Sequence, residues 1–123
     1  MYSIMVLMTD GMINDLAETK DTIVQLSYLP CSLIIVGIGE NTDWTQFERF
    51  VKGGGSIKNS AGQHGMRDIL EFVPFGKVRH GLSDEVLKKV PLEFMTYMEA
   101  RSIKPMPVQY DYSENQMPQQ TLL

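Results

Sequence analysis

A continuous apolar run near the start of the chain ends at a carboxylate. Residues Ile4 to Met8 are apolar at every position, and Thr9, Asp10 and Gly11 follow directly. A strand with one wet face would alternate apolar and polar residues. This run therefore predicts a central strand of a parallel sheet that helices cover on both faces. Asp10 would then lie at the carboxyl end of that strand, the edge where open α/β sheets bind ligands.

Asp10 has two interpretations from the residues alone. Its carboxylate is a hard oxygen ligand of the kind that Mg²⁺, Mn²⁺ or Ca²⁺ accepts, although one carboxylate needs further oxygens fixed around it. An aspartate after a strand is also a common turn former or helix N-cap. The two interpretations carry similar weight at this point.

A helix and a second apolar strand follow the first strand. Asp15 is the expected N-cap, with Glu18 three residues on, and the helix is expected to end at Leu29-Pro30. The run from Ser32 to Gly39 again predicts a fully buried strand. Strand, helix and strand then form a right-handed βαβ unit, so the two strands are parallel.

The rest of the chain continues the alternation of helices and strands. A short helix should follow the capping residues 41–43 and pack its aromatic side chains on one face, and the run 69–75 predicts a third strand nearer an edge and less buried. Ser83 is the expected N-cap of a last helix that runs to Met98, and Pro91 should kink or divide it. From Ser102 the chain is polar and rich in proline and glutamine, which is typical of a tail.

Composition limits the classes of protein. The chain has 123 residues, which suits one domain, and its net charge of −4 argues against nucleic-acid binding. No apolar run is long enough for a transmembrane helix, and no secretory signal is recognisable, so the cytosol is the expected compartment. Cys31, the one cysteine, excludes an internal disulfide and fits a small buried apolar side chain.

Motifs for catalysis are weak. Gly37-Ile38-Gly39 lacks the third glycine of a dinucleotide fingerprint, so close packing of a helix on the strand is the better interpretation. His64 and His80 lack the spacing and the neighbouring acids of a zinc site and are expected to be exposed loop residues. No serine lies in a nucleophile-elbow motif, which argues against acyl transfer.

Several segments of the chain form one familiar series. They are Tyr2 to Asp15, Thr22 to Val24, Leu29-Pro30, Ser32 to Gly39, Arg67 to Phe75, Val86 to Pro91, and Tyr97-Met98. Together they resemble the C-terminal half of the von Willebrand factor A-type (vWA) domain of copines. The resemblance runs over about residues 2–107, and the block from Arg67 to Phe75 favours copines over other A domains.

The resemblance implies an α/β fold with a Rossmann-like, mostly parallel sheet flanked by helices, of which only about the C-terminal half is present. Residues 1–101 would form this partial vWA domain and residues 102–123 the tail. Asp10 matches the last element of the family's metal-ion-dependent adhesion site (MIDAS). The D-x-S-x-S loop and the distant threonine of that site have no counterpart in the sequence. Mg²⁺ or another divalent cation is therefore expected in a complete domain, without tight binding by this chain alone.

The resemblance also implies a non-catalytic interaction module that recruits protein targets. Copines bind phospholipid when calcium rises through two C2 domains that this sequence does not include, and in full length they are cytoplasmic and peripherally membrane-associated. Two alternatives stay open, a metal-assisted phosphoryl-transfer enzyme using Asp10 and an inactive structural fragment. In the family's strand order the strand Tyr2 to Met8 would be left as an apolar edge, which predicts self-association or pairing with a partner.

Overall fold

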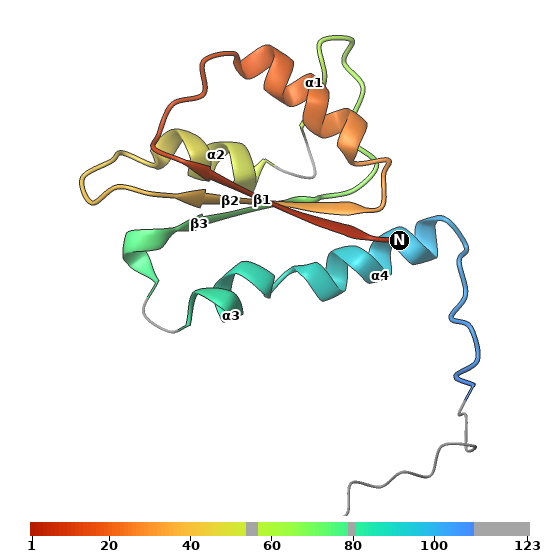
Figure 1. The fold of residues 1–123 in the computed structure, drawn as a ribbon. Coiled ribbons are helices and arrows are strands. Elements are labelled where there is room, and N and C mark those ends of the chain that lie inside the picture. The colour runs from red at the N-terminus through yellow and green to blue at the C-terminus, as the bar shows by residue number, and fades with distance from the viewer. Residues whose placement is uncertain (54–56, 79–80, 110–123) are drawn as a thin grey trace, which may run out of the picture.

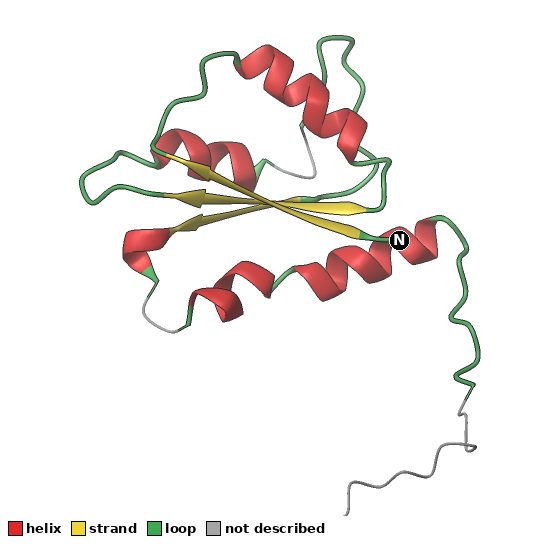
Figure 2. Ribbon diagram, viewed as in Figure 1, coloured by secondary structure: helices red, strands yellow, loops and turns green. Residues whose placement is uncertain are grey.

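The computed structural model describes residues 1–53, 57–78 and 81–109 of the chain. Within them a three-stranded parallel sheet has the order β1-β2-β3, with β1 at Ser3–Thr9, β2 at Cys31–Gly37 and β3 at Leu70–Pro74. Helices α1 (Leu16–Leu26) and α2 (Thr45–Lys52) cover one face of the sheet, and α3 (Leu82–Leu87) and α4 (Val90–Ala100) cover the other (Figure 1; Figure 2). The predicted α/β fold is confirmed.

The middle strand β2 is the centre of the core. All of its residues except Leu33 are buried. Ile35 packs with α1, α2 and β3 on one face, whereas Ile34 and Val36 pack with Val73 and Val86 on the other. A strand whose two faces both lie in apolar clusters needs no polar alternation, which is why its sequence is a continuous apolar run.

Helix α1 begins where the sequence predicts. The Asp15 carboxylate accepts a hydrogen bond from the Glu18 backbone amide at 3.0 Å, so Asp15 is the N-cap. The helix ends at Leu26, somewhat earlier than predicted, and brings the chain back to β2. The parallel β1–β2 pair predicted for this βαβ unit is confirmed.

The glycine that ends β2 makes room for two aromatic side chains, one from the residue before α2 and one from β3. A Cβ atom added at Gly37 would lie 2.9 Å from the Trp44 ring and 3.0 Å from the Phe72 ring. Trp44, Phe47 and Phe72 are buried and contact one another as an aromatic cluster. The interpretation of this glycine as a packing residue is therefore confirmed.

Strand β1 differs from its sequence prediction. It lies at the edge of the sheet formed by the described residues, not at its centre, and it is mostly exposed. Val6 and Met8 expose 55% and 72% of their surfaces. The apolar run predicted the strand correctly but the central position wrongly, because apolar composition does not specify how many neighbours a strand has. The apolar edge expected from the resemblance is observed.

Strand β3 and the last helices show two smaller differences. β3 is at an edge, as predicted, but Leu70, Phe72 and Val73 are buried because helices cover both of its faces. Pro91 divides the final helical segment into α3 and α4, as predicted. The first of these helices begins at Leu82 with Gly81 as its N-cap, so the prediction of Ser83 as the cap is wrong.

The chain leaves the sheet after α4 through a C-terminal cap. Ser102 has a φ of 54°, its amide donates to the Glu99 carbonyl at 3.0 Å, and the Ile103 amide donates to the Met98 carbonyl at 2.9 Å. This pair of bonds is the Schellman motif, which ends a helix and redirects the chain. Residues 103–109 are exposed and have no regular secondary structure, and the rest of the predicted tail lies outside the described residues.

We predict that Gly37→Ala destabilises the fold. The added methyl group would overlap the Trp44 and Phe72 rings, so the free energy of unfolding should fall by about 1–3 kcal/mol in urea denaturation. Gly76→Ala is the matched control, because nothing lies within 4 Å of its added Cβ atom. Equal stability of the two variants would contradict the packing role of Gly37.

Candidate functional site

The carboxyl edge of the sheet carries the residues singled out from the sequence. The Ile38 amide donates to the Thr9 carbonyl at 2.8 Å and joins the turns that follow β1 and β2. Gly11 and Gly39 have φ values of 130° and 143°, which side-chain-bearing residues rarely adopt. These glycines let both turns fold closely against the loop that contains Thr42.

Asp10 stands alone at this edge. Its side chain is exposed, and among the described residues it has no hydrogen-bond or ion-pair partner. A turn former would bond to a nearby amide, and the cap of α1 is Asp15, so neither structural interpretation of Asp10 is supported. The carboxylate is therefore free to act as a ligand.

The residues around Asp10 do not complete a cation site. The Thr42 side chain of the adjoining loop lies close to both glycines, with its hydroxyl facing Gly39 and its methyl group facing Gly11. No group of three or more His, Cys, Asp or Glu side chains that could hold a metal occurs in residues 1–53, 57–78 and 81–109. A divalent cation prefers six or more oxygens, so the described residues offer it too few.

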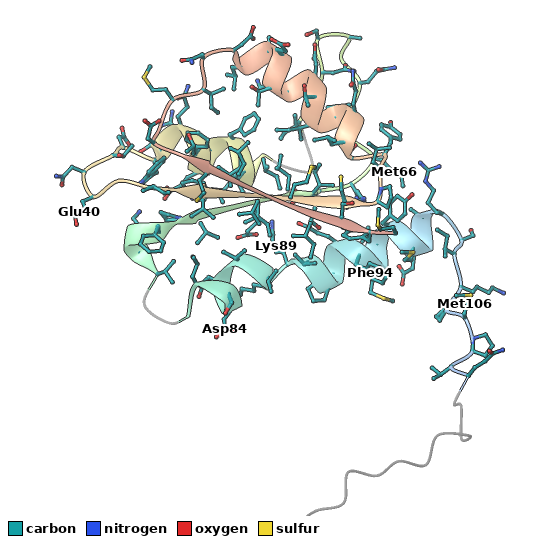
Figure 3. The ribbon with its side chains drawn as sticks, viewed as in Figure 1. Glu40, Met66, Asp84, Lys89, Phe94 and Met106 are labelled. Atoms are coloured by element: carbon teal, nitrogen blue, oxygen red, sulfur yellow. The ribbon has the colours of Figure 1, made fainter. Side chains whose placement is uncertain are left out.

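A hollow of about 460 Å³ lies beside this edge, between the β2–α2 loop and the end of β3. Two of the three carboxylates in its lining have partners. Asp43 accepts hydrogen bonds from the Thr45 amide at 3.0 Å and the Thr45 hydroxyl at 2.6 Å, which lower its pKa, and Glu48 pairs with Lys77 at 3.4 Å. Glu40 points outward at the tip of the loop (Figure 3). The Asp43 and Glu48 carboxylates of the hollow are therefore engaged in holding the loop and α2 in place.

The other candidate chemical groups also have structural roles. Cys31 is buried, and this burial raises the pKa of its thiol, as expected of an unreactive side chain. The Ser60 hydroxyl bonds to Asp21 at 2.7 Å, and this bond lowers the pKa of the aspartate. His64 is an exposed loop residue, as predicted, whereas His80 lies outside the described residues.

At the opposite, amino-terminal edge of the sheet, Arg67 organises a buried polar cluster. Its side chain is only 8% exposed, and Nη2 donates to the Leu29 carbonyl at 2.5 Å and to the Cys31 carbonyl at 2.6 Å. The guanidinium carbon lies 5.7 Å from the Tyr2 ring centroid and 5.2 Å from that of Tyr97. One cation thus joins the residue before β1, the start of β2 and α4.

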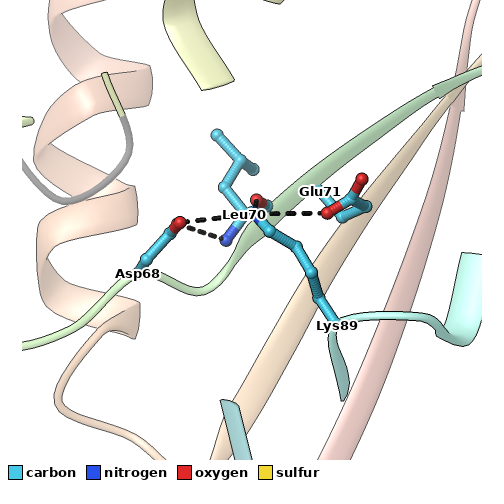
Figure 4. A network of polar contacts seen from close by, with 4 residues as sticks. All are labelled: Asp68, Leu70, Glu71 and Lys89. Atoms are coloured by element: carbon cyan, nitrogen blue, oxygen red, sulfur yellow. Dashed lines mark hydrogen bonds and ion pairs between the residues drawn. The ribbon is translucent and has the colours of Figure 1, made fainter. Parts of the chain in front are cut away.

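Lys89 forms a second part of this cluster, between α3 and α4. Its ammonium group lies 3.3 Å from the Asp68 carboxylate and 3.2 Å from the Glu71 carboxylate, and it donates to the Leu70 carbonyl at 3.1 Å (Figure 4). Burial lowers the pKa of Lys89, but the two carboxylates outweigh it and hold that pKa above its usual value. The contacts attach the helical layer to the start of β3.

Glu93 is the buried acid of this edge. Burial raises the pKa of its carboxyl, and the hydrogen bond with Ser32 and the charges of Lys89 and Arg67 oppose that shift only in part. One carboxylate oxygen has no hydrogen-bond partner among the described residues. Glu93 therefore reduces the stability of the fold when it is ionised.

Sequence reasoning missed this amino-terminal cluster. Arg67 and Asp68 stand directly before the third apolar run, in the block that carries the resemblance, but their roles depend on partners far along the chain. A charged pair that precedes a buried strand was the available signal. Arg67 and Lys89 bind backbone carbonyls, and Lys89 also pairs with two carboxylates, which is the pattern of contacts that joins structural elements.

We predict weak or undetectable Mg²⁺ binding by this chain. Calorimetric titration with MgCl₂ should give a dissociation constant above about 1 mM, because a single exposed carboxylate cannot replace the hydration shell of the ion. Asp10→Asn should leave the titration unchanged. Tight one-to-one binding that Asp10→Asn abolishes would show that further ligands surround Asp10.

We also predict that Glu93→Gln stabilises the fold at pH 7, by about 1 kcal/mol or less, because the amide carries no charge to bury. A raised folded-state pKa means that the wild-type chain loses stability as pH rises from 4.5 through that pKa. The advantage of the variant should therefore shrink toward pH 4.5 in urea denaturation. A less stable variant at pH 7 would mean that attraction to Arg67 and Lys89 outweighs the cost of burial.

Two plant proteins resemble this chain in sequence. It is 38% identical over 110 residues to Protein BONZAI 1 of Arabidopsis thaliana, an alignment that covers 86% of this chain and 19% of that protein. It is also 38% identical over 109 residues to Protein BONZAI 2 of the same plant, covering 85% of this chain and 18% of that protein. The chain thus spans about a fifth of the length of these curated relatives.

The match to a family model covers most of the described structure. The model described as Copine matches residues 1–106, which include every strand and helix from β1 to α4. The matched residues contain Asp10 at the carboxyl edge and the Arg67 cluster at the amino-terminal edge. The chain belongs to the copine family.

Proposed function

We propose that this chain acts as a non-catalytic protein interaction module of the copine vWA type. The observation that carries the proposal is the exposed, unpartnered carboxylate of Asp10 at the carboxyl edge of a sheet that belongs to the copine family. Open α/β sheets bind their ligands at this edge. Asp10 would contribute one ligand to a metal-ion-dependent adhesion site, and the remaining oxygens would come from outside the described residues.

The membrane role is proposed for a longer protein. None of the helices in the described part of the chain is long and apolar enough to cross a bilayer. Peripheral, calcium-dependent association with phospholipid would come from C2 domains, and the vWA module would then bring protein targets to the membrane from the cytoplasm. The chain covers about a fifth of its curated relatives, which leaves room for such domains in proteins of this family.

The alternative of metal-assisted phosphoryl transfer has less support. That chemistry needs at least a second acid near Asp10 to hold the cation, together with groups that bind the phosphate. The neighbouring carboxylates of Asp43 and Glu48 are engaged with Thr45 and Lys77. No specific feature of the described residues favours this alternative.

Proximity labelling tests the interaction role. The chain fused to a biotin ligase should label a reproducible set of proteins more strongly than the ligase alone does. Asp10→Ala should reduce the labelling of those proteins at least about threefold if Asp10 belongs to the contact, because an exposed polar contact contributes about 1 kcal/mol. Lys58→Ala, a change at another exposed charged residue, is the control.

Two results would contradict the proposal. Labelling no stronger than that of the ligase alone would remove the interaction role. Turnover of a phosphate ester by the purified chain that disappears in Asp10→Ala would replace it with the enzymatic alternative.

A further inference from the structure

The outer edge of β3 carries backbone groups that β2 does not use. The Ile69 carbonyl accepts a hydrogen bond from the Leu33 amide at 2.7 Å, so the odd-numbered residues from Ile69 onward direct their backbone groups toward β2. Backbone direction alternates along a strand. The amides and carbonyls of Leu70 and Phe72, together with the carbonyl of Pro74, therefore face outward.

Side chains of the same chain occupy the outward groups of Leu70. Its amide donates to the Asp68 carboxylate at 3.1 Å, and its carbonyl accepts from the Lys89 ammonium group at 3.1 Å. At the other end of the strand, Pro74 has no amide to donate. Phe72 is then the one residue of β3 whose outward amide and carbonyl are not occupied by a side chain of the described residues.

Lys89 also gathers charges along this edge. Its ammonium group lies 3.3 Å from the Asp68 carboxylate and 3.2 Å from the Glu71 carboxylate (Figure 4). The side chains of Lys89 and Asp68 are each 39% exposed, so water reaches these charges. A strand that paired with β3 would have to displace the ammonium group from the Leu70 carbonyl and remove the charges from water, which opposes pairing.

The break between α3 and α4 fixes the position of Lys89. Pro91 is the second residue of α4 and has no amide hydrogen to donate, so the helical segment cannot continue unbroken through it. Lys89 is the N-cap residue of α4. On either side of it, Val86 and Val90 pack in the apolar cluster that contains Val73 of β3. The side chain of Lys89 therefore reaches the strand edge from a backbone position that both helices hold against the sheet.

These contacts give Lys89 a role beyond joining the helices to the sheet. We propose that Lys89 keeps the outer edge of β3 closed, so that a second copy of the chain cannot add its own β3 there. A second copy is the relevant strand donor, because it presents the same edge at the same concentration. The closed edge lies on the opposite side of the sheet from β1, and its role goes beyond the proposed function and does not depend on Asp10.

The geometry indicates what the loss of Lys89 would expose. Without the ammonium group, the Leu70 carbonyl would face outward without a donor, beside the amide and carbonyl of Phe72. A second β3 placed antiparallel, with Phe72 opposite Phe72, would then exchange the two N–H···O bonds of a hydrogen-bonded pair. The edge that Lys89 closes would thus become competent for pairing.

A double variant tests the closure. Lys89→Met keeps the length of the side chain but removes its charge and its donors, and Glu71→Gln removes an acid that would otherwise lose its cation. One charge of each sign is removed, so the net charge of −4 does not change. Sedimentation velocity should show self-association at least about tenfold tighter than that of the wild-type chain, because the charges that oppose pairing are absent.

Lys88→Met with Glu99→Gln is the matched control. It makes the same two changes at exposed residues whose side chains form no ion pair within the described part of the chain, so its self-association should equal that of the wild type. Lys89→Arg, which keeps a cation and hydrogen-bond donors at the edge, should also behave as the wild type. Far-UV circular dichroism would confirm that each variant is folded before association is compared.

Hydrogen exchange of the Phe72 amide locates the interface and also tests the wild-type chain. In the wild type its rate should not change with protein concentration, whereas in the folded double variant it should fall at least about tenfold as the edges pair. A wild-type rate that falls with concentration would overturn the proposal. A folded double variant that associates no more tightly than its control, or that associates without protecting this amide, would overturn it as well.

Discussion

The burial of β2 between two helical layers is the constraint on which the rest of the structure depends. Its two faces join separate apolar clusters, so both neighbouring strands must pair with it in parallel and helices must cover both sides. Gly37 and Trp44 close one end of this arrangement, and Arg67 fixes the other by binding the carbonyls of Leu29 and Cys31 at the start of β2. The two outer strands nevertheless end up in unequal surroundings: β3 is buried, whereas β1 is exposed.

Local patterns in the sequence predicted much of this fold. The cap at Asp15, the break at Pro91 and the close packing at Gly37 each depend on a few adjacent residues whose conformational preferences are strong. The position of β1 could not be read in the same way. An apolar run reports that a strand prefers burial on both faces, but the described residues supply that burial only in part.

The candidate site was predictable in position but not in composition. Asp10 lies at the carboxyl edge, where a carboxylate that follows an apolar strand was expected. The Thr42 side chain faces the two glycines, and the Asp43 carboxylate bonds to Thr45. Both orientations depend on how the loop packs in the folded chain, so the sequence alone did not show that these groups would leave Asp10 without a partner. Arg67 hydrogen-bonds to residues more than 30 positions away, so the charged pair before β3 could mark the position of the cluster but could not identify its partners.

The two incomplete features of the molecule lie close together. Asp10 follows directly after the strand whose outer edge is unpaired, and both point to groups supplied from outside the described residues. For Asp10, membership of the copine family makes a cation shared with further ligands the natural expectation. The family, the open edge and the free carboxylate thus fit a module that acts by association.

Residue-resolved hydrogen exchange of the β1 amides tests this account most directly. The Met5 and Leu7 amides face β2 and should exchange slowly at every protein concentration. The Ile4, Val6 and Met8 amides face away from β2 and should exchange faster than the Met5 and Leu7 amides. Equal protection of the two sets of amides would contradict the account, because β1 would then not pair with β2 in the register described.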